Sequence, residues 1–113
     1  MEDFDAADDA FTDDANQVLG LVFDEVLRQR VLWGEQNHPD GTGAPGMDGL
    51  ADAVKEDNQQ RVESGELTFL DILNEEFLEA AAETDPTRLK EELIQVAAVA
   101  VTWVMAIDRR GNG

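Results

Sequence analysis

The chain has 113 residues, of which 42% are hydrophobic, enough for one small folded domain but not for two separate cores. It contains no cysteine, which excludes disulfides, thiol catalysis and zinc–thiolate sites. Its net charge of −18 disfavours binding to duplex nucleic acid or to anionic membranes, because both attract basic surfaces.

The N-terminal part of the chain combines an acidic segment with a helical pattern. Residues 1–14 are rich in Asp and predict a disordered tail. From Ala15 to Trp33 apolar residues recur at helical spacing, and Gly34 follows, so we expect a first helix there. The segment from Trp33 to Gly49, WGEQNHPDGTGAPGMDG, is a long Gly- and Pro-rich loop, and loops of this length in small domains are usually functional or disordered.

Two further helices are expected in the middle of the chain. Asp48 to Ser64 is weakly amphipathic, and Gly65 ends the pattern. Thr68, with an aspartate three positions later, forms a capping-box pattern, which predicts the start of a third helix that runs to about Glu83.

A fourth helix is predicted from the pair Asp85-Pro86, an N-cap residue followed by proline at the first helical position. It should run to about Arg110 and end at Gly111. No alternation typical of strands is present. The sequence therefore predicts a single all-α domain over residues 15–110, with residues 111–113 as a short tail.

The fourth helix is apolar almost all round between Val96 and Ile107. A monomer of this size can hardly bury one helix on every side, so we expect the core to be completed by a homo-oligomer, either a dimer or a dimer of dimers. The apolar stretch is too short to cross a bilayer, and the acidic N-terminus does not resemble a secretory signal. A cytoplasmic protein is the expectation.

Two acidic clusters stand inside apolar helices, one around Glu76 and Glu79 and the other around Glu92. On a helical wheel these three glutamates border apolar stripes, whereas Glu75 turns outward. Carboxylates in such surroundings repel one another unless a partner neutralises them, and a divalent cation is one such partner. The alternative is that they lie at the rim of the bundle and pair with basic side chains such as Arg88, because Glu-x-x-Glu is a weak motif by itself.

A helix with Glu-x-x-Glu, a short connection and a second helix in which Glu-x-x-Asp is expected together resemble the MazG family of all-α nucleoside triphosphate pyrophosphohydrolases. The resemblance covers about Asp71 to Ile107, with the text EEFLEAAAE…LKEELIQVAAVAVTWV, and WGEQNHPDG resembles a loop of MazG-like proteins from phages and actinobacteria. It implies a four-helix MazG-like bundle that binds Mg²⁺, or alternatively Mn²⁺, and cleaves the α–β phosphate bond to give a nucleoside monophosphate and pyrophosphate. Carried over by position, the catalytic metal ligands are Glu76, Glu79 and Glu92, with Gln95 as a fourth ligand.

Gln95 stands where the family has Asp. An amide oxygen still suits a hard cation, but the loss of one negative charge should weaken metal binding and the activation of water. Glu83, one turn after Glu79, is a candidate to compensate. Three alternatives to an enzyme therefore stay open: an attenuated relative that binds or sequesters a nucleotide, an oligomeric interaction protein, and a small bundle without a ligand.

Candidate substrate-binding residues lie in the long loop and in the second predicted helix. An aromatic ring is suited to stacking on a base, carboxamide and carboxylate groups to contacts with base or ribose, and basic side chains to phosphate. The residues of these types are Trp33, Asn37, His38, Asp40, Lys55 and Arg61. Each has a plainer alternative: Trp33 is suited to a core position, His38 to a solvated loop, and Asp40 with Gly41 to an ordinary turn.

Overall fold

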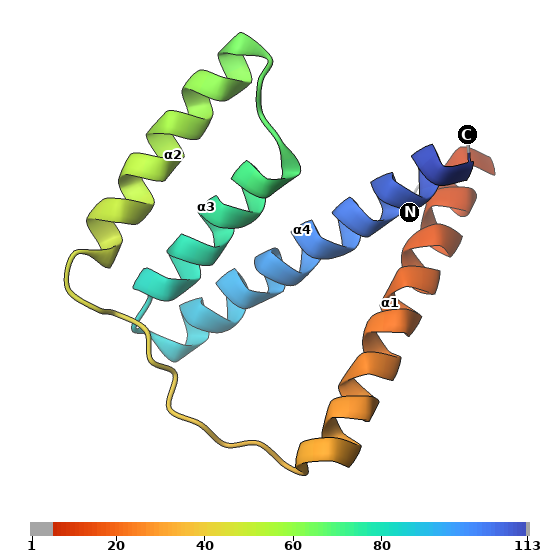
Figure 1. Cartoon of the computed structure of the whole chain (residues 1–113), viewed down its shortest axis with the longest axis horizontal. Coiled ribbons are helices and arrows are strands. Elements are labelled where there is room, and N and C mark those ends of the chain that lie inside the picture. Colours follow the sequence, from red (N-terminus) through yellow and green to blue (C-terminus); the bar gives the residue numbers. More distant parts are fainter. Residues whose placement is uncertain (1–5, 113) are drawn as a thin grey trace, which may run out of the picture. The chain divides into compact units, whose positions relative to one another are not determined.

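The structure is a computed structural model of the chain and describes residues 6–112. Over this range it contains four helices and no strand: α1 (Ala6–Trp33), α2 (Met47–Ser64), α3 (Phe69–Ala82) and α4 (Pro86–Asn112) (Figure 1). The predicted all-α class is confirmed for this part of the chain. None of these helices carries an apolar stretch of the length that crossing a bilayer requires.

The first helix begins earlier than predicted. It starts at Ala6 instead of Ala15, so residues 6–14 are helical, and only residues 1–5 of the expected tail lie outside the described range. Asp8 and Asp9 stand in its first turn, where carboxylates interact favourably with the free N–H groups of a helix N-terminus. Both are exposed to water, so a high density of acids does not prevent the helix from forming.

The boundaries of α2 follow local sequence signals. It begins at Met47, one residue before the predicted start, and ends at Ser64 as predicted. Gly65 adopts a left-handed conformation with φ of 75°, and its N–H donates to the carbonyl oxygens of Arg61 and Val62. Glycine reaches this conformation without the strain that a Cβ atom brings, so the predicted stop is confirmed together with its cause.

The ends of α3 and α4 are also set by their flanking residues. At the start of α3 the N–H of Asp71 donates to Thr68 Oγ1 over 3.1 Å, and the N–H of Thr68 donates to Asp71 Oδ2 over 3.0 Å. This reciprocal pair is the predicted capping box. Helix α4 begins at Pro86 as predicted but runs to Asn112, so Gly111 lies in its last turn.

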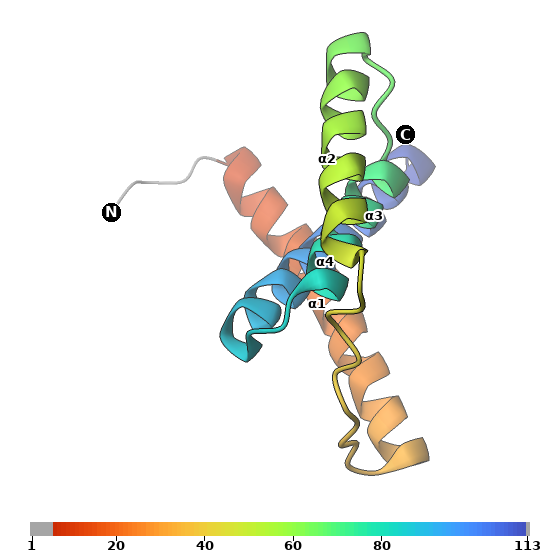
Figure 2. The ribbon, with the colours of Figure 1, turned by 90° about the vertical axis from the view of Figure 1, so that its left-hand side faces the viewer.

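The described chain divides into two compact units. The first contains α1 with the residues up to His38, together with α4 from Val101 onwards; the second runs from Pro39 to Ala100. In the second unit α2 and α3 lie side by side (Figures 1 and 2). Ala51 of α2 and Leu78 of α3 are among its buried residues.

A buried amide fixes the position of α2 against α3. Asn58 is only 5% exposed, and its Nδ2 donates to the carbonyl oxygen of Asp71 over 2.8 Å and to Glu75 Oε1 over 3.0 Å. A buried amide without partners would be destabilising, so these two bonds favour one register of the two helices. Glu75 is therefore partly buried and engaged with α2, which corrects the prediction that it turns outward.

The long loop is attached to the end of α3. The N–H of Gly43 donates to the carbonyl oxygen of Ala81 over 2.8 Å. Gly43 has a φ of +82°, and a Cβ atom at this position would collide with the methyl group of Thr84. Glycine is required here both by the backbone conformation and by the close approach to Thr84. The loop is thus held against the end of α3 at Gly43.

Many large apolar side chains remain exposed in the single chain. In the first unit Val18 and Met105 are buried, whereas most of the apolar residues of α1 are not. The exposed ones on α1 are Phe11, Leu19, Leu21, Val22, Phe23, Val26, Leu27, Val31, Leu32 and Trp33. Monomeric proteins rarely expose contiguous apolar surface on this scale, and such surface commonly marks an interface.

Candidate metal centre

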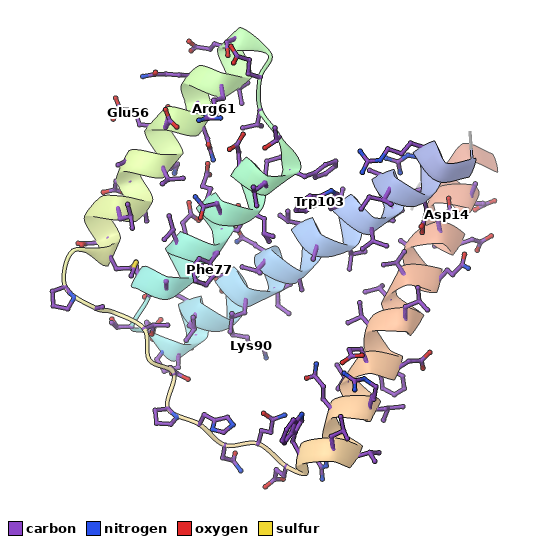
Figure 3. The ribbon with its side chains drawn as sticks, in the orientation of Figure 1. Asp14, Glu56, Arg61, Phe77, Lys90 and Trp103 are labelled. Carbon is purple, nitrogen blue, oxygen red and sulfur yellow. The ribbon has the colours of Figure 1, made fainter. Side chains whose placement is uncertain are left out.

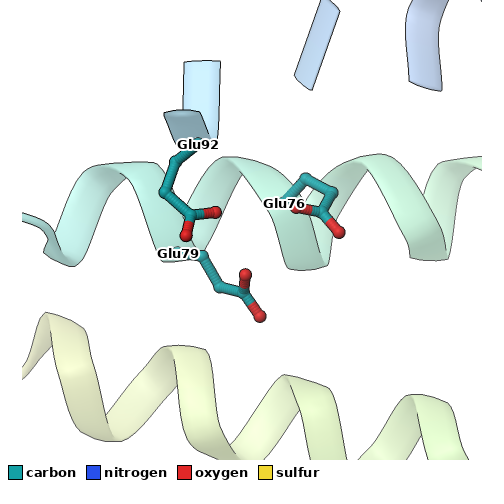
Figure 4. A group of neighbouring side chains, drawn as sticks. All are labelled: Glu76, Glu79 and Glu92. Atoms are coloured by element: carbon teal, nitrogen blue, oxygen red, sulfur yellow. The ribbon is translucent and has the colours of Figure 1, made fainter. Parts of the chain in front are cut away.

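Three carboxylates meet in the second unit. Glu76 and Glu79 lie one turn apart on α3, and Glu92 reaches them from α4 (Figure 4). Each of the three side chains offers one carboxylate oxygen, and these three oxygens all lie within 4.8 Å of one another. We call Glu76, Glu79 and Glu92 the carboxylate trio. The structure thus brings together the three acids that the sequence analysis singled out.

The connection between α3 and α4 places Glu92 beside α3. Only Glu83, Thr84 and Asp85 separate the two helices. Glu83 Oε1 accepts the N–H groups of Thr84 over 3.1 Å and of Asp85 over 3.0 Å, which stabilises this turn. One carboxylate oxygen of Glu83 is therefore engaged with the backbone, and its role as a compensating ligand stays a prediction.

Two oxygens of the carboxylate trio lack a partner. Oε2 of Glu76 and Oε2 of Glu92 are inaccessible to water and accept no hydrogen bond from the described residues. An unsatisfied buried carboxylate oxygen is destabilising, because it has lost its hydration without gaining a donor. The trio is therefore strained electrostatically unless a positive group is added.

The same conflict shifts the pKa values of two of these acids. Burial raises the pKa of Glu76, and the neighbouring charges of Glu92 and Glu75 raise it further, while Lys55 opposes them. Burial likewise raises the pKa of Glu79, with added repulsion from Glu76 and Glu92. A set of carboxylate oxygens that disfavours its own negative charge is suited to a hard divalent cation, which prefers oxygen ligands and supplies the missing charge.

A cavity of about 280 Å³ opens beside the trio, between α2 and the α3–α4 connection. Its lining residues are Asp48, Ala51, Asp52, Lys55, Glu79, Ala82, Glu83 and Glu92. The cavity is thus strongly acidic, with a single basic residue. An anion enters such a cavity only if cations accompany it.

The two basic candidates of α2 have different surroundings. Lys55 lines the acidic cavity. Arg61 is tied to two aspartates, with Nε 3.2 Å from Asp57 Oδ2 and Nη1 3.5 Å from Asp71 Oδ2 (Figure 3). Of these two basic residues, only Lys55 lines the cavity that Glu79 and Glu92 also line.

Gln95 follows Glu92 by nearly one turn of α4, but its side chain is exposed and does not line the acidic cavity. Its role as a fourth ligand stays a prediction.

Three of the loop candidates belong to a different unit from the carboxylate trio. Trp33, Asn37 and His38 belong to the first unit, where they line a separate cavity of about 360 Å³ together with Glu35 and Gln36. Asn37 Nδ2 donates to Glu35 Oε2 over 3.2 Å, and His38 Nε2 lies 3.4 Å from Gln36 Oε1. Trp33 is 71% exposed, so it does not occupy a core position in the single chain.

Asp40 lies in the second unit but in a third cavity. This cavity of about 260 Å³ is mostly apolar, and Asp40 and Thr42 are its polar lining residues. Five of the six predicted substrate-binding residues therefore line three different cavities, Arg61 lines none of these, and only Lys55 shares its cavity with Glu79 and Glu92.

The sequence analysis missed three polar residues of α2. Asp48 and Asp52 line the acidic cavity, and Asn58 anchors α2 to α3. A signal for this face was present, because positions 51, 55 and 58 follow the i, i+4, i+7 spacing of one helical side. The weak amphipathicity of α2 concealed it, since two of these three residues, Lys55 and Asn58, are polar.

The chain was compared with protein-family models, curated proteins and solved structures, and none of them matched. The function is therefore argued from the carboxylate trio and its cavity.

Proposed function

We propose that this chain is a divalent-cation-dependent nucleoside triphosphate pyrophosphohydrolase of the MazG type. The observation that supports the proposal is the carboxylate trio, with two buried oxygens that have no donor among the described residues. Hard oxygen ligands on two helices of an all-α protein are suited to Mg²⁺ or Mn²⁺. The resemblance of the sequence around these acids to MazG proteins adds the substrate class.

In this proposal Glu76, Glu79 and Glu92 hold the cation and orient it toward the cavity. When bound there, Mg²⁺ or Mn²⁺ neutralises polyphosphate charge and makes a water molecule a stronger nucleophile. Hydrolysis of the triphosphate would form a bond from a water oxygen to the α-phosphorus and break the bond from this phosphorus to the α–β bridging oxygen. A nucleoside monophosphate and pyrophosphate would leave, and the proton of the water would pass to the solvent.

The test is release of pyrophosphate from common nucleoside and deoxynucleoside triphosphates, with Mg²⁺ or Mn²⁺ and with a chelator. Glu92→Gln should lower the rate at least about tenfold, because even indirect supports of a metal ligand commonly have effects of that size. Glu91→Gln is the matched control, since Glu91 precedes Glu92 in α4 and is exposed. If no triphosphate yields pyrophosphate at high protein concentration with either metal, the hydrolase proposal is wrong.

A second candidate function is nucleotide binding without turnover, as in a protein that sequesters a nucleotide. Gln95 favours it, because a neutral side chain stands where the family has a carboxylate, and it is exposed. Calorimetry separates the two functions: a sequestering protein binds the triphosphate in the presence of metal and releases no pyrophosphate. An interaction protein without a ligand binds neither metal nor nucleotide.

We also propose that the working form is a homo-oligomer, either a dimer or a dimer of dimers. The exposed apolar residues of α1 support this, as do Leu93, Ile94 and Ile107 of α4, all of which are exposed in the single chain. Association would remove this surface from water, which is the main favourable contribution to protein assembly.

A further inference from the structure

Lys55 is exposed, and it lines the acidic cavity from α2. It lies on one face of α2 with Ala51 and Asn58, which are only 6% and 5% exposed. The i, i+4, i+7 spacing places all three on the same side of the helix. Because Asn58 is held by its two hydrogen bonds to α3, the register that presents Lys55 to the acidic cavity is fixed by the fold.

The ammonium group of Lys55 is near the carboxylate trio without being locked to it. Its charge acts on Glu76, where it opposes the repulsion from the other acids. Yet it forms no ion pair within 4.0 Å among the residues that the structure describes, in contrast to Arg28 and Arg61. Its donors are therefore available to another acceptor.

Lys55 is surrounded by acidic residues in this cavity. Asp48, Asp52, Glu79, Glu83 and Glu92 line it, and Lys55 is the one basic residue among the lining residues. A phosphate group that enters finds one side-chain cation to bind. A divalent cation that enters without an anion is repelled by the same ammonium group, because both are positively charged.

We propose that Lys55 couples metal binding to polyphosphate binding: it opposes a divalent cation bound alone and stabilises the same cation once a polyphosphate accompanies it. The inference rests on the proposed function, because it assigns the bound anion to the metal at the carboxylate trio. A lysine that served only to offset the acids would weaken metal binding and add nothing for the anion. A lysine that served only the fold would affect both ligands in the same direction.

Replacing Lys55 should therefore have opposite effects on the two ligands. Lys55→Met should tighten binding of Mn²⁺ alone by about threefold, as expected when a like charge several ångströms away is removed from a partly solvated site. It should weaken binding of inorganic tripolyphosphate at saturating Mn²⁺ by about tenfold, since a charge-assisted hydrogen bond is lost. Lys55→Arg keeps the charge and should leave Mn²⁺ affinity close to that of the wild type.

The experiment measures free Mn²⁺ by electron paramagnetic resonance in titrations of the full chain, and tripolyphosphate binding by calorimetry with Mn²⁺ in excess. Lys90→Met is the matched control. Lys90 is an exposed lysine of α4 that does not line the cavity, so this variant makes the same change in net charge elsewhere (Figure 3). Circular dichroism compares helix content, and Lys55→Gln replaces Lys55→Met if the latter does not reach the wild-type value.

Opposite shifts in the Lys55 variant, with neither shift in the Lys90 variant, support the coupling. The inference is wrong if both affinities fall together, if neither changes, or if Lys90→Met reproduces both effects. If the wild-type chain binds no Mn²⁺ at all, the metal site itself fails, and the proposed function is lost together with the inference. Binding of Mn²⁺ by the wild type with no effect of Lys55 rejects the inference alone.

Discussion

Asp71 takes part in two kinds of interaction, one that caps its own helix and one that connects this helix to the preceding one. Its carboxylate accepts the N–H and the hydroxyl group of Thr68 at the start of α3, and it lies 3.5 Å from Nη1 of Arg61 on α2. The backbone hydrogen bond from Thr68 lowers the pKa of Asp71 most, followed by the Thr68 hydroxyl, and Arg61 lowers it as well. A single carboxylate thus stabilises both the start of α3 and its contact with α2.

The pH dependence of stability should reveal this role. Because the pKa of folded Asp71 lies below its ordinary value of 3.8, the ionised form stabilises the fold above pH 3.8, and this contribution is lost as the pH falls through the lowered value. Asp71→Asn should therefore melt at a lower temperature than the wild type near pH 7, and the difference should shrink below pH 3.8. Thermal melts of both proteins between neutral and acidic pH test this.

Asp24→Asn on α1 is a control for the loss of one exposed carboxylate. It should not reproduce the pH-dependent difference. A gap between Asp71→Asn and the wild type that stays constant with pH would contradict the capping and pairing role of the carboxylate.

The side of a helix on which a residue lies can be predicted from the sequence of that helix alone. The i, i+3 spacing of Glu76 and Glu79, and the apolar stripe that begins at Glu92, were sufficient to select the carboxylate trio. Asn58 and Glu75 were missed or misplaced because their bond crosses from one helix to another. A wheel for one helix cannot show which polar residue a neighbouring helix presents.

At the scale of whole elements, the starts and ends that carry a chemical signal were predicted well. The capping box at Thr68, Pro86 at the first position of α4 and Gly65 after α2 all stand where expected. Helix α1 begins nine residues before the predicted start, because the high density of acids in residues 1–14 predicts disorder. Those acids are solvated, so they do not oppose a helix.

The attachment of the long loop to α3 depends on Gly43. Gly43→Ala should destabilise the chain by about 1–2 kcal/mol from its left-handed backbone alone, with an added penalty from the collision with Thr84. Gly41 also has a positive φ, but a Cβ there would meet nothing within 4 Å, so Gly41→Ala isolates the backbone contribution. Urea denaturation should show Gly43→Ala as the less stable of the two.

Gly49, inside α2, completes the comparison. It lies in a helix with open space around it, and alanine there should stabilise the chain by about 0.5–1 kcal/mol. Equal losses for Gly43→Ala and Gly41→Ala would mean that the close approach of Thr84 adds no penalty at position 43.

For the whole molecule, the dominant features are the exposed apolar surface of α1 and the net charge of −18. They act in opposite directions, because apolar surface favours association whereas like charges on two copies repel each other. Added salt screens that repulsion, since the Debye length falls from about 10 Å at 0.1 M to about 3 Å at 1 M. Assembly should therefore become tighter as ionic strength rises.

Analytical ultracentrifugation tests this prediction. The mass should be a multiple of the 12.4 kDa of one chain, and the fraction assembled should rise with protein concentration and with salt. Phe23→Asp should shift the equilibrium toward the single chain, because it places a charge on the exposed apolar surface of α1. A constant mass of one chain under all conditions would contradict the proposed oligomer.

The exposure of Trp33 also makes the molecule its own optical probe. The chain has two tryptophans and no tyrosine, so its ultraviolet fluorescence comes from Trp33 and Trp103 alone. Replacing Trp103 by phenylalanine leaves one emitter, at the rim of the cavity that contains His38. Quenching of that emitter would report a base stacked on the indole, and a blue shift would report its burial in an assembly, so one unlabelled sample can distinguish the two events.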